Sequence, residues 1–140
     1  MYSPSDHTFA LCAYGESPYL GECLESLLSQ KTKSNIIVST STPNDYIAAV
    51  AKKYGVALFI NSGQPGIAHD WNCAVSHCVT PLVTIAHQDD VYEPLYSQRM
   101  LEQINAAKDP LIFFTGYGEL RKEGKVTDNR LLNIKKVLLK

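Results

Sequence analysis

The sequence predicts an α/β fold with a mostly parallel sheet flanked by helices. Three observations predict this class. Apolar runs of strand length alternate with stretches of helical periodicity, turn-forming residues separate them, and the length of 140 residues suits one ordinary domain. Repeated strand and helix units of this kind are typical of parallel sheets with right-handed crossovers.

The first unit is a strand, a loop and a helix. Residues 8–14 form a nearly continuous apolar run, as expected for a strand covered on both faces. Ser17 followed by Pro18 is typical of a helix N-cap with proline at the first helical position. Apolar residues then recur at helical spacing as far as Leu28, which predicts an amphipathic helix.

Two more strand and helix units follow. Residues 35–40 and 56–60 predict the second and third strands, and residues 43–54 predict the helix between them, which ends at Gly55. After a loop at residues 61–66, helical spacing predicts a third helix. Its apolar residues are Ile67, Trp71, Ala74, Val75 and Cys78, and we expect Trp71 to lie in the core.

The rest of the chain predicts two more strands, a hairpin and two helices. Residues 82–86 form an apolar strand, and a helix follows Pro94. Residues 111–115 predict a fifth strand, and residues 117–126 predict a hairpin. Residues 131–140 have an amphipathic helical pattern whose apolar face needs a partner, which would allow a homo-oligomer formed through this helix.

Composition restricts the class of protein. The net charge of −1 and the pI of about 6.4 give no general case for a nucleic-acid partner. No apolar run approaches the ~20 residues that span a bilayer, and the N-terminus lacks signal-peptide features, so we expect a cytoplasmic protein. The last 20 residues contain seven basic and two acidic residues, which would allow a peripheral position at the inner membrane face.

The four cysteines do not form a known redox or zinc pattern. Their spacing contains neither a Cys-x-x-Cys pair nor four-ligand zinc spacing, so we expect buried free thiols. The residues are Cys12, Cys23, Cys73 and Cys78.

Polar and acidic residues stand where the predicted strands end. They are Tyr14 with Glu16, Ser39 with Ser41, the loop at residues 63–66, and Asp89 with Asp90. Because the carboxyl ends of parallel strands share one edge, these groups predict a pocket for a nucleotide. Adjacent carboxylates there would suit a divalent metal that also binds phosphate, although an Asp-Asp turn with solvated side chains is the alternative.

Three segments resemble family-2-type glycosyltransferases of the GT-A fold. The first covers residues 9–30, including Ala-Tyr-Gly-Glu-Ser-Pro-Tyr-Leu and Glu-Ser-Leu-Leu-Ser-Gln. The second is the glycine-led helix at residues 66–74, and the third is His87-Gln88-Asp89-Asp90, which resembles the metal motif of that family. The resemblance implies a Rossmann-like GT-A fold and an enzyme that transfers sugar from a nucleotide-diphospho-sugar donor.

The resemblance also implies roles for individual residues. Ala13, Tyr14 and Glu16 would border the base and ribose, and Asp89 would contact the ribose. Asp89 and Asp90 would hold Mn²⁺ or Mg²⁺, which bridges the diphosphate. With the strand-end pattern, the candidate nucleotide-binding residues are Ala13, Tyr14, Glu16, Ser39, Ser41, Gly66, Asp70 and Asp89, and the candidate metal ligands are Asp89 and Asp90. Asp70 would either point into the pocket or only stabilise its helix N-terminus.

The sequence also departs from the family pattern. Relatives commonly carry an acidic pair after the second strand, where this chain has Ser39-Thr40-Ser41-Thr42. A base or ribose contact is therefore lost there or becomes a neutral hydrogen bond. His87 replaces the first acid of the metal motif, and we expect it to hydrogen-bond beside the ligands. Trp71 stands where relatives often have Arg. We expect His69 and His77 to be surface or capping groups.

The catalytic base of inverting relatives lies well beyond the fifth strand, so we expect none in this chain. We assign residues 1–126 to a nucleotide-sugar-binding domain and residues 127–140 to a basic amphipathic tail that begins an acceptor half. The acceptor would be a glycan, a lipid-linked sugar or a protein. Two alternatives are a non-catalytic nucleotide-sugar-binding or assembly module and, less well supported, a nucleotidyltransferase, since Gly15-Glu16-Ser17-Pro18 is not a basic glycine-rich phosphate loop.

Overall fold

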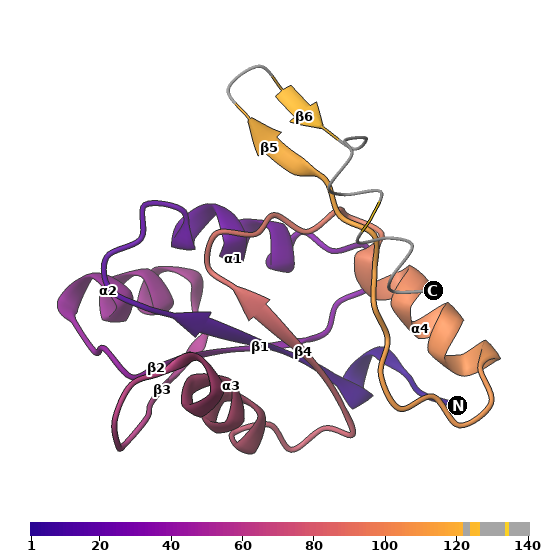
Figure 1. The fold of residues 1–140 in the computed structure, drawn as a ribbon, viewed down its shortest axis with the longest axis horizontal. Coiled ribbons are helices and arrows are strands. Elements are labelled where there is room, and N and C mark those ends of the chain that lie inside the picture. Colours follow the sequence, from indigo (N-terminus) through magenta and orange to yellow (C-terminus); the bar gives the residue numbers. More distant parts are fainter. Residues whose placement is uncertain (122–123, 127–133, 135–140) are drawn as a thin grey trace. The chain divides into compact units, whose positions relative to one another are not determined.

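The computed structural model describes residues 1–121, 124–126 and 134. The chain divides into two compact units, Met1–Ala107 and Lys108–Lys140, and each is described by itself. Figure 1 shows the strands and helices of both units along the chain.

The first unit is built on a parallel sheet of four strands, in the order β3-β2-β1-β4. After a short 3₁₀ turn, η1 (Pro4–Asp6), the central strand β1 (His7–Ala13) pairs with β2 (Asn35–Thr40) on one side and β4 (Leu82–His87) on the other. Strand β3 (Ala57–Ile60) continues the sheet beyond β2. The predicted α/β class with a parallel sheet is confirmed.

Helices cover both faces of this sheet. Helices α1 (Leu20–Leu28) and α2 (Asp45–Tyr54) lie on one face, and α3 (Ile67–Ser76) lies on the other (Figure 1). Alternate residues of β1 point toward α1 and α2, because side chains alternate across a strand. They join one core cluster with the apolar faces of these helices. The buried members are Phe9, Leu11, Ala13, Leu20, Cys23, Leu24, Leu27, Val38, Ile47 and Ala86.

The fourth helix, α4 (Tyr96–Ala106), follows Pro94 as predicted. It buries Ser97, Met100, Leu101 and Ile104 at helical spacing. The ring of Phe9 lies 5.5 Å from that of Tyr92 and 5.7 Å from that of Tyr96, so aromatic contacts connect the start of α4 with the main core.

Two predicted helix starts were wrong. Helix α1 begins at Leu20 with Tyr19 as N-cap, because the backbone of Ser17 is used in a turn that accepts a hydrogen bond from the Leu20 N–H. Helix α2 begins at Asp45, since Asn44 is the N-cap and accepts a hydrogen bond from the Ile47 N–H at 2.8 Å. Gly55 ends α2 in the left-handed conformation, with φ of 65°, as its position predicted.

In the second unit, β5 (Glu119–Arg121) pairs with β6 (Gly124–Val126) antiparallel, which confirms the predicted hairpin. The predicted strand at residues 111–115 was wrong, since residues 110–118 form neither helix nor strand. Strand formation needs a backbone partner as well as apolar composition, and no described strand pairs with this stretch. Most of the predicted helix at residues 131–140 lies outside the described residues.

No helix within the described part of the chain is both long enough and apolar enough to cross a bilayer.

Candidate functional site

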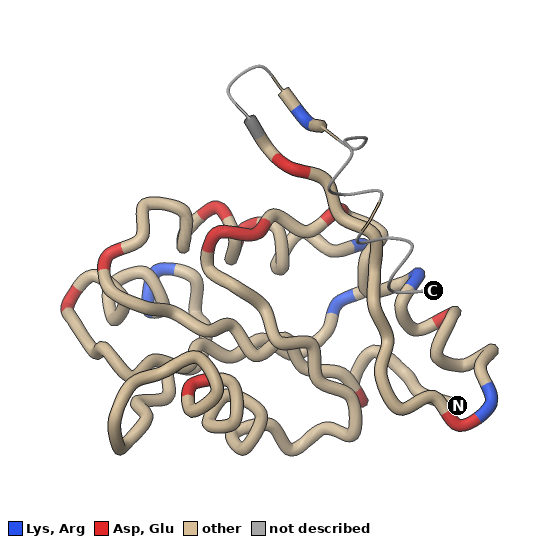
Figure 2. Tube along the Cα trace, viewed as in Figure 1, with Lys and Arg blue, Asp and Glu red and all other residues tan. Residues whose placement is uncertain are grey.

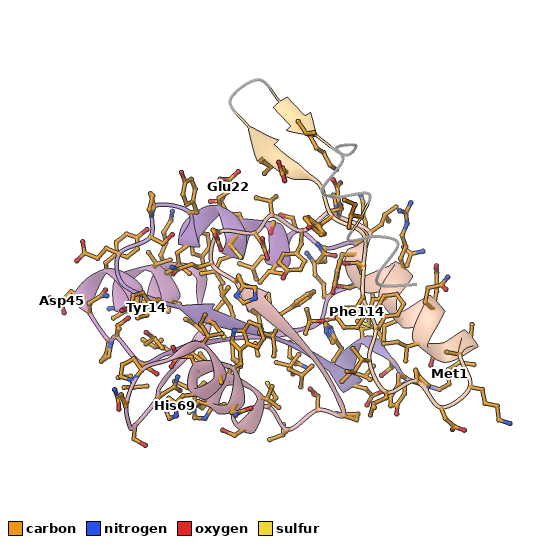
Figure 3. The ribbon with its side chains drawn as sticks, in the orientation of Figure 1. Met1, Tyr14, Glu22, Asp45, His69 and Phe114 are labelled. Carbon is orange, nitrogen blue, oxygen red and sulfur yellow. The ribbon has the colours of Figure 1, made fainter. Side chains whose placement is uncertain are left out.

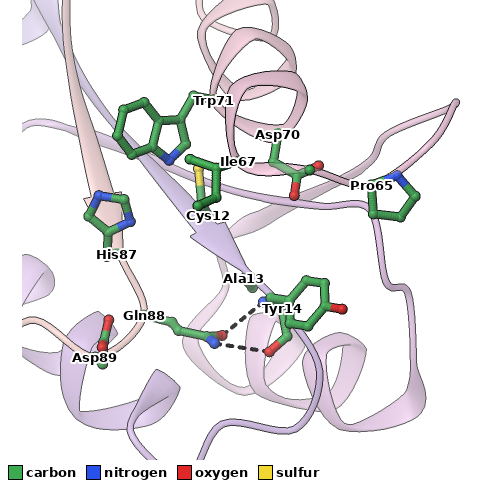
Figure 4. Close-up of a pocket in the computed structure, with 11 residues that line it drawn as sticks. Cys12, Ala13, Tyr14, Pro65, Ile67, Asp70, Trp71, His87, Gln88 and Asp89 are labelled. Carbon is green, nitrogen blue, oxygen red and sulfur yellow. Dashed lines mark hydrogen bonds between the residues drawn. The ribbon is translucent and has the colours of Figure 1, made fainter.

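A cleft with a volume of about 410 Å³ opens at the carboxyl ends of β1 and β4, beside the first turn of α3 (Figure 4). Ligands of open α/β sheets bind at such strand ends, where the loops that follow different strands of the sheet meet. The residues that line it are Cys12, Ala13, Tyr14, Pro65, Gly66, Ile67, Asp70, Trp71, His87, Gln88 and Asp89.

Gln88 joins the two strand ends that border the cleft. Its Oε1 accepts a hydrogen bond from the Tyr14 N–H at 2.9 Å, and its Nε2 donates one to the Tyr14 carbonyl at 2.9 Å. Cys12 pairs with His87 at the end of the β1 and β4 register, so the Gln88 amide adds contacts just beyond it. Tyr14 lies beyond the tip of β1, and its side chain is 62% exposed (Figure 3).

Two adjacent acidic residues, Asp89 and Asp90, come directly after Gln88 at the end of β4, where the tube is red in Figure 2. Asp89 lines the cleft and is exposed, and the Asp90 N–H donates to the His87 carbonyl at 3.1 Å, which closes a turn. Desolvation raises the pKa of Asp90 most, the negative charge of Asp89 raises it further, and His87 opposes this shift. The two carboxylates therefore form a site where a cation would relieve unfavourable negative charge.

The donor set at this turn is small. Among the described residues, no group of three or more His, Cys, Asp and Glu side chains is arranged to hold a metal. Mg²⁺ commonly binds proteins through one or two carboxylates and takes its other ligands from substrate phosphates and water. Asp89 and Asp90 fit that type of site. They are too few to hold the metal by protein ligands alone.

Helix α1 holds the loop that follows β4. The Cys23 thiol donates to the His87 carbonyl at 3.2 Å, and Ser26 Oγ accepts from the Tyr92 N–H at 3.0 Å. The buried Gln30 amide donates to the Glu93 carbonyl at 2.9 Å and accepts from the Ser97 N–H at 3.0 Å. One side of α1 and Gln30, the residue after its C-cap, thus position both ends of the loop that contains the acidic pair.

Asp70 forms the other side of the cleft, in the first turn of α3. In Figure 4 it lies across the cleft from Asp89. The Ser41 hydroxyl donates to Asp70 Oδ1. Asn61 Nδ2 donates to Ser41 Oγ at 3.1 Å, and Asn61 Oδ1 accepts from Ser39 Oγ at 2.9 Å. A hydrogen-bond network from the ends of β2 and β3 therefore orients Asp70.

Trp71 lies at the wall of the cleft, and the prediction of a core position was wrong. Its side chain is 39% exposed, and its ring lies 5.4 Å from that of His87. Ala74 is the buried residue of α3, because this short helix contacts the sheet through a narrow stripe. Ile67 and Val75 are exposed, and the helix ends before Cys78.

The other histidines and the thiols have structural contacts. His77 is the C-cap residue of α3, as expected, and its ring Nε2 lies 3.0 Å from Asn61 Oδ1. His69 lies 3.5 Å from the Cys73 sulfur. All four cysteines are free, but only Cys23 is fully buried. Burial raises the pKa of Cys12 to about 11, and the negative charge of Asp70 adds to this shift.

The structure brings several of the predicted residues together at the cleft. Ala13, Tyr14, Gly66, Asp70 and Asp89 line it. Ser41 does not line the cleft but donates a hydrogen bond to Asp70, which does. Ser39 is only 2% exposed and hydrogen-bonds Asn61. Glu16 and Asp90 are exposed but do not line the cleft.

Six lining residues were not among the predicted nucleotide-binding residues. They are Cys12, Pro65, Ile67, Trp71, His87 and Gln88. Five of them are next to a predicted residue in the sequence, so widening each prediction by one residue would have included them, and His87 is two residues before Asp89. The metal motif already contained His87 and Gln88, whereas the apolar side chains of Cys12 and Ile67 gave no chemical reason to include them.

Comparisons with known proteins agree with this architecture. The model of glycosyl transferase family 2 matches residues 8–136. Among solved structures, the chain is similar to TarS residues 1–349 from S. aureus, with a TM-score of 0.59 and 21% identity. The match covers 71% of this chain and 32% of the TarS chain, so this chain spans about a third of the length of that structure. No curated protein matches the chain significantly.

The TarS likeness confirms the predicted GT-A-like fold, and the family match confirms the resemblance found in the motifs. Because the family model extends over most of the sequence, the chain belongs to glycosyl transferase family 2.

Proposed function

We propose that this chain is the donor-binding portion of a glycosyltransferase that takes a sugar from a nucleotide-diphospho-sugar. The main support is the cleft, which has an acidic turn on one side and an oriented carboxylate on the other. In a family 2 chain, this arrangement suits a ligand with a diphosphate at one end and a nucleoside at the other.

Asp89 and Asp90 would hold Mn²⁺ or Mg²⁺ together with the diphosphate. Their adjacent positions at an exposed turn support this, because the two carboxylates are close enough for the charge of Asp89 to raise the pKa of Asp90, after the larger effect of desolvation. When bound, the cation would stabilise negative charge on the leaving nucleoside diphosphate.

The chain's own residues would bind and orient the donor. Gln88 fixes the backbone of Tyr14 through two hydrogen bonds, so the exposed Tyr14 ring is positioned to border the nucleoside. Asp89 would contact the ribose as well as the metal. We place the acceptor site and the catalytic base outside this chain, which spans 32% of the TarS structure. A positioned base usually contributes about 10²–10⁴-fold to the rate.

Thermal unfolding tests this proposal. UDP, GDP, dTDP and CDP are each added with Mn²⁺, with Mg²⁺ or with EDTA. At a ligand concentration of about 100 Kd, binding to the folded state would add about 2.7 kcal/mol to the free energy of unfolding. We expect at least one nucleotide to raise the Tm with metal and not with EDTA.

Matched variants locate the effect at the cleft. Asp89→Asn and Asp90→Ala should abolish the metal-dependent shift. Glu22→Gln is the control, since it removes an exposed acidic charge on α1, whose residues do not line the cleft. Absence of any shift with all four nucleotides would exclude the proposed function.

A further inference from the structure

We propose that Asp70 is a specificity residue that binds the nucleobase, and that it selects bases with a ring N–H: uracil, thymine or guanine. The end of β2 has no acidic side chain, and Asp70 of α3 would provide a carboxylate at that place. This inference rests on the proposed donor-binding function and adds the chemical class of the base.

The first observation is where the carboxylate lies. The end of β2 and the following turn contain only neutral hydroxyl side chains, at Ser39, Thr40, Ser41 and Thr42. Asp70 is 29 residues farther along the chain, but its Oδ1 accepts a hydrogen bond from the Ser41 hydroxyl. The α3 helix therefore brings a negative charge to the end of β2.

The second observation is the direction of the hydrogen bonds. Asn61 Nδ2 donates to Ser41 Oγ at 3.1 Å, so the Ser41 proton is directed to Asp70. Asn61 itself is fixed, since its Oδ1 accepts from Ser39 Oγ and lies 3.0 Å from His77 Nε2. The His77 ring stacks on Phe59 with centroids 4.6 Å apart. This network orients Asp70 as an acceptor of hydrogen bonds.

The third observation is the position of Asp70 relative to Asp89. The two carboxylates lie across the cleft from each other, with Tyr14 and Gln88 along the edge between them (Figure 4). In a nucleoside diphosphate, the phosphates and the base are at opposite ends of the molecule. If the diphosphate binds at Asp89, the base extends toward Asp70.

An ionised carboxylate can only accept hydrogen bonds. Uracil and thymine present N3–H to it, and guanine presents N1–H with the adjacent amino group. Cytosine N3 and adenine N1 are acceptors, so each would place a lone pair against the carboxylate and offer it only the exocyclic amino group as a donor. Asp70 therefore favours the first three bases and disfavours the other two.

The test measures the Kd of UDP, dTDP, GDP, CDP and ADP with Mg²⁺ by calorimetry. A hydrogen bond to a charged group contributes enough for roughly a 10- to 100-fold change in affinity. Asp70→Ala should raise the Kd of UDP, dTDP and GDP, whose bases have a ring N–H, by that factor. The Kd of CDP and of ADP should change little. Asp70→Asn, which has nearly the same shape, is the second variant and guards against a loss of binding caused by misfolding.

A relocation variant separates recognition from structure. The double variant Ser41→Asp with Asp70→Ala removes the carboxylate at position 70 and places one at position 41, at the end of β2. These two positions are in hydrogen-bond contact in the unmodified chain. We expect the double variant to recover UDP binding lost in Asp70→Ala, which a purely structural role of Asp70 would not allow. Inorganic pyrophosphate with Mg²⁺ probes the acidic side alone, and its binding should be unchanged by Asp70→Ala and lost in Asp89→Asn.

The outcomes distinguish this inference from the proposed function. If the unmodified chain binds no nucleoside diphosphate, the proposed function fails. If it binds UDP and Asp70→Ala binds UDP equally well, only the role of Asp70 is wrong. Equal weakening of all five nucleotides would assign Asp70 to the ribose and overturn the selection of bases.

Discussion

Gln88 exchanges two hydrogen bonds with the main chain of Tyr14, one in each direction and both 2.9 Å long. A side-chain amide thereby contacts a backbone N–H and C=O as a neighbouring strand would. The strand ends of β1 and β4 are thus held together at the cleft, beyond the point where their backbone pairing stops.

Replacement of this amide should loosen the site. Gln88→Ala removes both hydrogen bonds, and we expect a loss of about 1–2 kcal/mol in the free energy of unfolding together with weaker nucleotide binding. Gln88→Glu retains the acceptor and loses the donor, so its effect should be intermediate. Denaturant unfolding and calorimetry measure the two effects. Gln98→Ala on the exposed side of α4 is the control, and an equal loss in that variant would contradict the prediction.

His7 should make the fold sensitive to acid. Its side chain is buried, Nε2 lies 2.8 Å from Thr84 Oγ1, and Nδ1 has no hydrogen-bond partner among the residues that the structure describes. Burial lowers its pKa from the ordinary 6.5 to about 4. The unfolded chain therefore binds the proton more readily. The stabilisation is fully present above pH 6.5 and is lost as the pH falls toward 4, by about 3 kcal/mol in total.

Unfolding of the unmodified chain and of His7→Leu at pH 7, 6, 5 and 4 tests this. The variant should lose less stability across this range, although its stability at pH 7 is lower because Thr84 loses its hydrogen bond with His7. His69→Leu is the matched control at a partly exposed position. Parallel curves for the unmodified chain and His7→Leu would show that other groups cause the acid sensitivity.

Gln30 should be needed for a stable acidic loop. It is only 1% exposed, and its amide also donates to the Ser26 carbonyl at 3.1 Å besides bonding Glu93 and Ser97. Gln30→Leu leaves the buried Ser97 N–H without this partner, and we expect a cost of about 2–3 kcal/mol. Metal-dependent nucleotide binding should weaken as well. Gln103→Leu makes the same substitution on the exposed side of α4 and should have little effect on either measurement.

Trp71 provides a direct signal for occupation of the cleft. It is the single tryptophan of the sequence, and it is partly exposed at the cleft wall near His87. We expect its fluorescence to change when UDP or GDP binds with Mg²⁺. Trp71→Ala should cost less than the about 3–5 kcal/mol typical of a buried Trp. A fluorescence titration that is flat while calorimetry detects binding would place the ligand elsewhere.

Much of the fold could be predicted from the sequence because local patterns and tertiary contacts agree in the first unit. The apolar runs at β1, β2 and β4 are strands, and the spacing of Leu20, Leu24 and Leu27 marks the buried face of α1. The stretch at residues 111–115 shows the limit of such patterns. Its composition favours a strand, but pairing depends on residues distant in sequence, and Leu111 is 93% exposed.

The candidate site could be predicted only in part for a related reason. Strand ends located Tyr14 and Asp89 correctly at the cleft, since topology alone brings them together. The contacts of Asp70 with Ser41 and of Gln88 with Tyr14 depend on side-chain directions across segments 29 and 74 residues apart. Helical periodicity placed Trp71 in the core, because it cannot distinguish a buried stripe from a cleft wall.

The strand order has a consequence for the length of the ligand. β1 separates β2, whose end is joined to Asp70, from β4, whose end continues into Asp89. Neighbouring strands lie about 4.8 Å apart, so these two ends are separated by roughly 10 Å. The strand spacing therefore sets the length of a ligand that contacts both carboxylates. A free base or a free phosphate is long enough to contact only Asp70 or Asp89, whereas a nucleoside diphosphate is long enough to contact both.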